Sequence, residues 1–530
     1  MSNPASEPKI DRTYVSFQRS RSPRMALFRF LSAGTVIALK LALMCAMIDD
    51  RTAFLAYSVL LLVYIAVEIA SLHTNHIPYL WLCPVVLASI VIFVLGYGIT
   101  NFVILLPASI LPFAGLSADV GPSVNRLMLL VDLGCMAMWM GFHSRVADRA
   151  GQWLRLTPVL RRNLRLSYRM NPITVGICFA ISLAGRLFAM HLGVYGYFSA
   201  NAGSVDQLLS LASYTMYFHL ADQLGSLVLV VLALNCFAQN SPPLKDKLLL
   251  GLMLAFEISF GFLSGFKGSV IMPILVVSLV HYAIRGKFPK IAIPAVFVAL
   301  LFAYAIIEPA RQLHNTGLNQ SRDIGSVIAL GISAIETPSG IQSAGLPVQI
   351  VLLETLSRMN VTFAGVPGIE YAAQHNPLPP GSPTFLRNIL TAPISAIVPR
   401  FLWSGKAIGD TGYWYQREVL QTSFLSSAAI GLVTDLNFAG GGAAVLLGFF
   451  VMGFIQGMVY SGFARRGGGG FIVLFGLLGS LIGMTDSFSS LLIDITRLSV
   501  LLLVAQMFLF KPLFGREGEG SVITRFLESR

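Results

Sequence analysis

The sequence predicts an all-α polytopic membrane protein with about twelve transmembrane helices and one large external loop that contains short helices. Of its 530 residues, 55% are hydrophobic and only 12% are charged, and the mean hydropathy is +0.73. Soluble domains carry about 25% charged residues, so this chain lacks the ionic surface of a soluble protein. A bilayer is spanned by about 20 consecutive apolar residues, and such runs recur throughout. The composition excludes a soluble enzyme, a nucleic-acid-binding protein and a disordered scaffold.

The first part of the chain alternates apolar runs with basic breaks. A basic arm at 1–29 precedes apolar runs near 30–48, 53–72, 79–99, 125–142, 171–190, 209–238, 248–265, 269–284 and 291–307. Segment 143–170 carries seven arginines against one aspartate, and short cytoplasmic loops are rich in Lys and Arg. The arm and this loop are therefore both predicted to be cytoplasmic. An even number of spans must separate them, and the four apolar runs between 30 and 142 satisfy this. The apolar stretch 101–118, with its two prolines, would make the number odd if it crossed, so it is interpreted as re-entrant or interfacial.

The rest of the topology follows from the same rules. Residues 30–307 form a bundle of about nine spans, and residues 425–510 add about three, near 437–461, 471–486 and 489–510. Segment 511–530 is a cytoplasmic tail, which places both termini inside. Residues 308–424 contain no convincing span, and parity makes them a large external loop. The prolines of this loop indicate ordered turns, and 347–361 is predicted to be an amphipathic helix at the membrane surface.

Charged residues within or beside the predicted spans are functional candidates, because a charge in the bilayer is costly. They are Arg29, Lys40, Glu68, Asp132, Arg186, Asp222, Glu257 and Arg497. Some of them are expected to pair with one another, which offsets the cost of desolvation. A structural role for any single one is the simpler interpretation.

The predicted external loop breaks the usual scarcity of cations outside the cell. Between 308 and 424 it carries Arg311, Arg322, Arg358, Arg387, Arg400, Lys406 and Arg417, and Lys267 lies at the outer tip of a hairpin. One interpretation is a solvated loop with ordinary surface charges. The sharper one is an anion site near the outer membrane surface. Diphosphate is the lipid-borne anion that Arg and Lys bind well.

Segment 397–418, IVPRFLWSGKAIGDTGYWYQRE, is the strongest local cluster of candidate site residues, with aromatic, basic and acidic side chains close together in the sequence. Aromatic rings suit either a membrane interface or the face of a sugar, and glycines let a backbone approach a ligand closely. The aromatic residues are Trp403, Tyr413, Trp414 and Tyr415, the cations are Arg400, Lys406 and Arg417, and the candidate bases are Asp410 and Glu418. The segment favours a site for glycan and phosphate together, with an aromatic belt as the alternative.

No metal or cofactor is expected. The five cysteines lie in apolar runs without a CxxC pair or a nearby histidine, and no cluster has the spacing of metal ligands. Neither a GxSxG nor a Walker motif occurs, which argues against acyl transfer and nucleotide hydrolysis.

Several motifs, taken in order, resemble the Wzy-type oligosaccharide repeat-unit polymerases, the O-antigen and exopolysaccharide polymerases of bacteria. The resemblance covers about 260–462. It rests first on a serine-glycine-lysine type turn at 264–268 and on Arg311 at the end of an outward span. It rests further on a proline-arginine-aromatic-tryptophan stretch followed by a lysine at 399–406, and on the segment 422–431 that precedes asparagine-phenylalanine at 437–438. The chain departs from the pattern at Leu432, where members usually have glutamate, and at Ala407, where they usually have proline.

The resemblance implies a metal-independent glycosyltransferase with a GT-C-like architecture in the bacterial inner membrane. Such an enzyme uses undecaprenyl-diphosphate-linked glycans as both donor and acceptor and joins repeat units at the outer membrane face. Membrane lipid, a chain-length regulator and a flippase are the other candidate partners, and nucleic acid is not one.

Specific roles follow for the charged residues. Preorganised cations would stabilise the leaving diphosphate, and Arg311, Arg400 and Lys406 are assigned to it. The candidate general bases, in order, are Asp410, Glu418 and Asp435. The substrate-binding candidates are Lys267, Arg322, Arg358, Trp403, Tyr413, Trp414 and Arg417.

Two alternatives remain open. An O-antigen ligase, or another lipid-linked glycosyltransferase, would share the diphosphate site and differ in its acceptor. A polysaccharide-lipid transporter or flippase would need charges along a central path between related halves, whereas this chain shows no internal repeat.

Overall fold

The computed structural model describes most of the chain. The described residues are 23–45, 49–75, 77, 79–105, 121–156, 172–192, 194–196, 205–239, 241–296, 298–299, 307, 359–398, 402–403, 406, 411–422, 430–464, 469–483 and 487–509. Every regular element among them is helical, which confirms the predicted all-α class.

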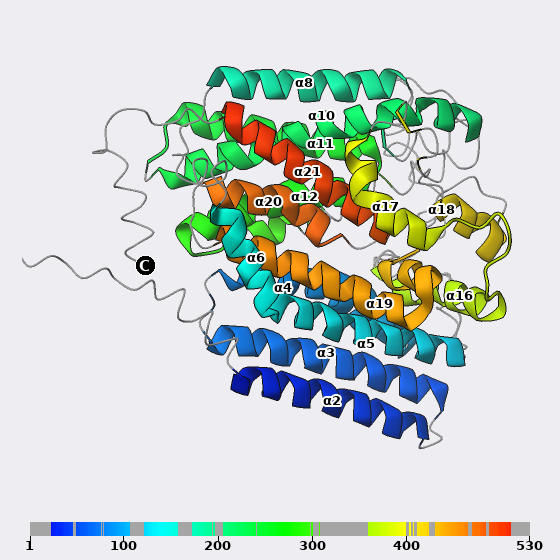
Figure 1. The fold of residues 1–530 in the computed structure, drawn as a ribbon. Coiled ribbons are helices and arrows are strands. Elements are labelled where there is room, and N and C mark those ends of the chain that lie inside the picture. The colour runs from blue at the N-terminus through cyan, green and yellow to red at the C-terminus, as the bar shows by residue number, and fades with distance from the viewer. Residues whose placement is uncertain are drawn as a thin grey trace, which may run out of the picture.

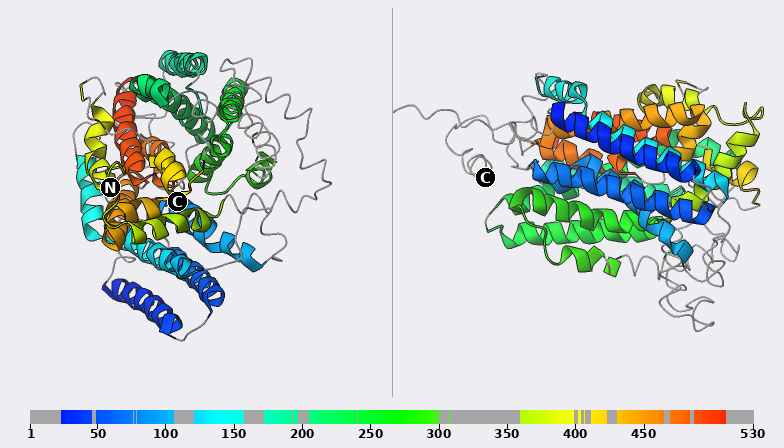
Figure 2. Two further views of the ribbon diagram at one scale, coloured as in Figure 1. Left: turned by 90° about the vertical axis from the view of Figure 1, so that its right-hand side faces the viewer. Right: turned by 90° about the horizontal axis from the view of Figure 1, so that it is seen from below.

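Most of the helices lie alongside one another in a single bundle, with α2 and α3 at one edge and α8 at the opposite edge (Figures 1 and 2). The N-terminal elements are α2 (Pro23–Cys45), α3 (Asp50–Thr74), η1 (Leu80–Leu82), α4 (Pro84–Ala88), η2 (Ser89–Gly98), η3 (Ile99–Leu105), α5 (Pro122–His143), α6 (Arg145–Leu156), α8 (Pro172–His191) and α10 (Val205–Ala238). The later elements are α11 (Leu244–Ser264), α12 (Lys267–Arg285), α16 (Val361–Gln374), α17 (Phe385–Ile397), α18 (Thr411–Trp414), η5 (Tyr415–Val419), α19 (Leu432–Val459), η6 (Tyr460–Ala464), α20 (Gly469–Leu481) and α21 (Phe488–Leu509).

Nine helices in the described part of the chain are long and apolar enough to cross a membrane, so this is a multi-pass membrane protein. They are Asp50–Thr74, Pro84–Leu105, Pro122–His143, Pro172–His191, Tyr217–Ala238, Leu244–Ser264, Gly268–Arg285, Leu432–Ala464 and Phe488–Ala505. The spans predicted near 30–48 and 471–486 correspond to the shorter apolar helices Leu31–Lys40 and Gly470–Leu481. Most of 300–307 and all of 106–120 lie outside the described residues, while 101–105 continues the preceding span.

Helices α5 and α19 form the centre of the bundle, where small residues let the two backbones approach. A Cβ at Gly141 of α5 would overlap the carbonyl oxygen of Phe450, and one at Gly453 of α19 would overlap that of Met138. Trp139 of α5 is 1% exposed. Helices α3 and α16 pack against α5, and α6 and α16 pack against α19.

Helix α19 begins earlier than the predicted span at 437–461 and is interrupted. The backbone leaves helical geometry at Gly440 and Gly441, and Gly441 has φ 65°, in the left-handed region that glycine tolerates best. Residues 432–438 before this break are all buried. The three consecutive glycines at 440–442 therefore separate a short, buried helical segment from the long membrane-spanning one.

Most of the costly charges identified from the sequence are paired, as expected. The pairs are Arg29 with Glu68 (3.0 Å), Lys40 with Asp132, and Arg186 with both Asp222 (2.6 Å) and Glu257 (2.8 Å). Each pair joins different helices, and these partners account for the buried charges without a ligand.

Candidate functional site

Short helices form a cap at the end of the bundle opposite α6 (Figure 1). We define the cap as α16, α17, α18, η5 and residues 432–439 of α19. Helix α16 begins where the side chain of Asn360 accepts a hydrogen bond from the backbone N–H of Phe363 (3.2 Å). Helix α17 ends at Ile397, and Val398, the residue before Pro399, is extended, as expected because proline disfavours helical geometry in the residue that precedes it.

A buried polar network that the sequence interpretation missed anchors the cap to the bundle. The side-chain oxygen of Asn101 in η3 accepts hydrogen bonds from Asn360 (2.9 Å) and Thr362 (2.8 Å), and its amide donates to Ser58 of α3 (2.9 Å). All four residues are buried. The polar residue Asn101 at the start of the apolar stretch 101–118 was the one sequence feature that could have indicated this network. Its partners Asn360 and Thr362 lie more than 250 positions further along the chain, so spacing could not reveal them.

Aromatic side chains pack together in the cap. Trp414 makes edge-to-face contacts with Tyr371, Phe385 and Phe438, with ring centroids 5.4–5.7 Å apart. Tyr415 is completely buried and donates a hydrogen bond from its hydroxyl to the carbonyl of Ala364 in α16 (2.7 Å). Burial raises the pKa of Tyr415, so the hydroxyl stays protonated and can donate. The structure therefore uses Trp414 and Tyr415 to hold α16, α17 and η5 together.

Glycines let α16 lie directly on this aromatic layer. A Cβ at Gly368 would overlap the side chain of Thr434 and come within 2.9 Å of the Tyr415 hydroxyl, and one at Gly365 would come within 2.8 Å of the Thr434 hydroxyl. The helix, the buried start of α19 and the aromatic layer therefore form one packed unit.

Lys406 and Trp403 lie against the C-terminal end of α17. The backbone N–H of Lys406 donates to the carbonyl of Trp403 (3.1 Å), which closes a turn, and the ammonium donates to the carbonyl of Val398 (3.0 Å). A cation at this position also interacts favourably with the helix dipole. The bond to Val398 uses one of the three donors of the ammonium.

Arg417 and Glu418 lie on the surface of η5. Their side chains form an ion pair with each other (3.0 Å) and are 84% and 43% exposed. Such exposed pairs contribute at most about 1 kcal/mol to stability, so both side chains can reorganise around a ligand at little cost. Tyr413, in the preceding turn α18, is partly buried.

Asp435 is 2% exposed and connects two membrane helices. Its carboxylate accepts a hydrogen bond from the backbone N–H of Phe488, the first residue of α21 (2.8 Å). The first N–H groups of a helix have no partner within the helix, and a negative charge there is favoured by the helix dipole. Asp435 thus caps α21 from α19, a role that the sequence interpretation did not anticipate.

The remaining predicted site residues cannot be placed. Arg311, Arg322, Arg358, Arg400 and Asp410 lie outside the described residues, and so does the side chain of Lys267, the first residue of α12. The described part of the cap and its connecting turns balances three cations against three carboxylates, namely Arg387, Lys406 and Arg417 against Glu370, Glu418 and Asp435. Four of the seven loop cations on which the predicted anion site rests, Arg311, Arg322, Arg358 and Arg400, therefore lie outside the described part.

Among the described residues, no three His, Cys, Asp or Glu side chains are grouped so that they could hold a metal ion. Trp414 contacts Phe385 at the first residue of α17, whereas Lys406 bonds to Val398 beyond its last residue, so these two predicted site residues lie at opposite ends of α17. No family model, no curated protein and no solved structure matches this chain.

Proposed function

We propose that this protein polymerises undecaprenyl-diphosphate-linked oligosaccharide repeat units into O-antigen or exopolysaccharide at the outer face of the bacterial inner membrane. The observation that carries the proposal is the position of Trp403, Lys406, α18 and η5, all from the predicted site segment 397–418. Helices α18 and η5 belong to the cap, and Trp403 and Lys406 follow the end of α17. The cap lies at the end of the bundle opposite α6, whose Arg145 and Arg149 are exposed. The positive-inside rule then favours a cytoplasmic α6 and an external cap.

In the proposed topology the chain crosses the membrane twelve times, with both termini in the cytoplasm and a GT-C-like arrangement. The nine apolar helices account for most of these crossings. The shorter helices Leu31–Lys40 and Gly470–Leu481 and the segment near 291–307 would supply the other three.

In the proposed reaction, a hydroxyl oxygen of the incoming repeat unit bonds to the anomeric carbon of the growing chain. The bond from that carbon to the diphosphate oxygen breaks, and undecaprenyl diphosphate leaves with the electron pair. Arg311, Arg400 and Lys406 stabilise the charge that develops on the leaving group, which lowers the barrier because this charge is larger in the transition state. A carboxylate takes the hydroxyl proton, with Asp410, Glu418 and Asp435 as candidates in that order.

Purified full-length protein tests the proposal directly. Incubation in detergent with lipid-diphosphate-linked repeat units should produce chains longer than one unit. Removal of one charge-stabilising donor typically costs a factor of about 100 to 1,000 in rate, so Arg400→Ala and Arg311→Ala should each abolish measurable growth. Arg149→Ala, an exposed arginine at the opposite end of the bundle, is the matched control and should polymerise normally. Arg400→Lys should be little more active than Arg400→Ala if a bidentate contact between the arginine and the phosphate is required.

The outcomes separate the competing functions. Detergent removes the second compartment, so chain growth there contradicts a transporter or flippase. A ligase would leave repeat units unjoined and would transfer polymer only when a different acceptor was supplied. Normal chain length in both Arg311→Ala and Arg400→Ala would remove these residues from the site, and no growth by the wild-type protein under any condition would contradict the polymerase.

A further inference from the structure

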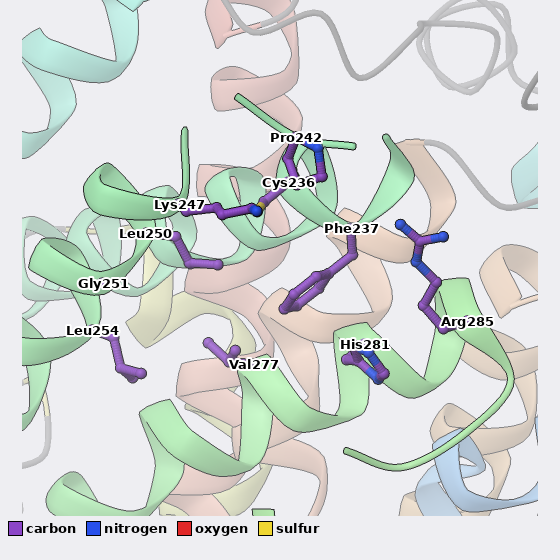
Figure 3. A pocket seen from close by; sticks show the side chains of 10 residues that line it. All are labelled: Cys236, Phe237, Pro242, Lys247, Leu250, Gly251, Leu254, Val277, His281 and Arg285. Atoms are coloured by element: carbon purple, nitrogen blue, oxygen red, sulfur yellow. The ribbon is translucent and has the colours of Figure 1, made fainter. Parts of the chain in front are cut away.

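A cavity of about 390 Å³ lies between α10, α11 and α12, far from the cap in sequence and unused by the proposed reaction (Figure 3). Its walls are apolar, formed by Phe237 of α10, Leu250 and Leu254 of α11 and Val277 of α12. Basic side chains complete the lining at Lys247, His281 and Arg285. The cavity thus joins an apolar groove to a cationic rim.

The helical repeat produces this combination. Lys247, Leu250, Gly251 and Leu254 follow the spacing i, i+3, i+4, i+7 and so share one face of α11. Val277, His281 and Arg285 occur at intervals of four on the facing side of α12. Gly251 adds no side chain to this lining, and a Cβ built there would enter open space, with no atom within 4 Å.

The basic groups are held at the rim of the cavity by polar contacts. Arg285 donates to the backbone carbonyl of Gln239, and His281 donates from Nδ1 to the carbonyl of Lys287 (2.9 Å). The nearby carboxylate of Asp246 accepts from the amides of Gln239 (3.1 Å) and Asn235 (3.4 Å) and does not line the cavity. Figure 3 shows Lys247 and Arg285 on either side of Phe237. An anion at the rim would therefore meet positive charge from α11 and from α12.

The position in the helices matches the depth of a lipid headgroup. Lys247 lies in the first turn of α11 and Arg285 is the last residue of α12, whereas Leu254 and Val277 lie deeper in the same membrane-crossing helices. Basic pockets between membrane helices bind anionic lipid headgroups. A soluble anion would use the cations and leave the apolar groove unoccupied.

We propose that this cavity binds an anionic phospholipid, with the phosphodiester between Lys247 and Arg285 and an acyl chain along Leu250, Leu254 and Val277. The lipid would bridge α11 and α12, which pack against each other, so it would also stabilise this part of the bundle by binding only the folded state. The inference does not depend on the polymerase proposal, because none of these residues belongs to the cap.

Native mass spectrometry of the purified full-length protein tests the site with phosphatidylglycerol and, as the uncharged comparison, phosphatidylcholine. A basic residue near a membrane surface contributes about 1 kcal/mol to binding an anionic lipid, which corresponds to about fivefold in Kd. Lys247→Gln should therefore weaken phosphatidylglycerol binding about fivefold. Lys245→Gln, an exposed neighbour that does not line the cavity, should leave it unchanged.

A second variant tests the groove independently of charge. Gly251→Leu should fill the cavity and reduce phosphatidylglycerol binding without lowering the thermal stability of lipid-free protein, because its side chain enters open space. Gly176→Leu, on the exposed side of α8 and also without neighbours within 4 Å, is the matched control. Equal binding by Lys247→Gln and Lys245→Gln, equal affinity for the two phospholipids, or displacement of phosphatidylglycerol by millimolar inorganic phosphate would overturn the proposal.

Discussion

Asp435 provides the sharpest test of the distinction between a structural and a chemical role in the cap. Its carboxylate is 2% exposed and accepts the backbone N–H of Phe488 at 2.8 Å. Asp435→Ala removes the acceptor and leaves a buried N–H without a partner, while Asp435→Asn keeps an oxygen that can accept the same bond. The two substitutions therefore separate the hydrogen bond from the negative charge.

The magnitudes follow from this geometry. A hydrogen bond to a charged group contributes about 1.5–3 kcal/mol, and loss of a helix cap costs about 0.5–2 kcal/mol. These two values describe the same contact, so we expect Asp435→Ala to lower the free energy of unfolding by about 2 kcal/mol. Asp435→Asn should lower it by about 1 kcal/mol, the difference between a charge-assisted and a neutral hydrogen bond. Denaturant titration of the purified protein in detergent measures both values.

Polymer formation by the same variants then decides the role. If Asp435 acts only as the cap of α21, Asp435→Asn should fold and extend chains at close to the wild-type rate. Loss of a general base typically costs a factor of about 100 to 10,000. A stable but inactive Asp435→Asn would therefore refute the structural interpretation and promote Asp435 above Asp410 and Glu418. An Asp435→Ala protein as stable as wild type would show that the bond to Phe488 does not hold the two helices together.

Two further predictions concern the packing of the bundle. Lys40 and Asp132 are 1% and 2% exposed and pair with each other. Lys40→Met or Asp132→Leu alone should therefore destabilise the protein by about 3–5 kcal/mol, whereas the double variant should be close to neutral. Additive losses of unfolding free energy in a double-mutant cycle would contradict the pairing. Gly368→Ala should cost about 1–3 kcal/mol because its Cβ would overlap Thr434. Gly176→Ala on α8 has open space and should not lower the unfolding midpoint.

Hydropathy predicted the helical class and most of the spans for a physical reason. A segment that crosses a bilayer must satisfy its backbone hydrogen bonds internally and cover about 20 residues with apolar side chains. Both requirements are local, so they can be recognised in the sequence. The sequence did not reveal the break in α19 because Gly440 and Gly441 leave helical geometry without interrupting the apolar run.

The candidate site was less predictable because composition does not say which side of an aromatic residue faces a ligand. Trp414 and Tyr415 carry the ring surfaces expected of a sugar site, yet their contacts are with α16, α17 and the start of α19. Lys406 has the predicted charge, and its observed hydrogen bond is to the end of α17. Arg311, Arg322, Arg358 and Arg400 lie outside the described part of the chain, so their role stays a prediction.

The sequence by itself determined that the chain is a helical membrane protein, where most of its spans lie, and which charges would need partners. Only the tertiary structure decided who those partners are. Lys40 meets Asp132, Asp435 meets the N-terminus of α21, and Asn101 meets Asn360 across more than 250 residues. Hydropathy is a property of consecutive residues, whereas each of these contacts requires two helices to pack in one register, and that register is set by the whole bundle.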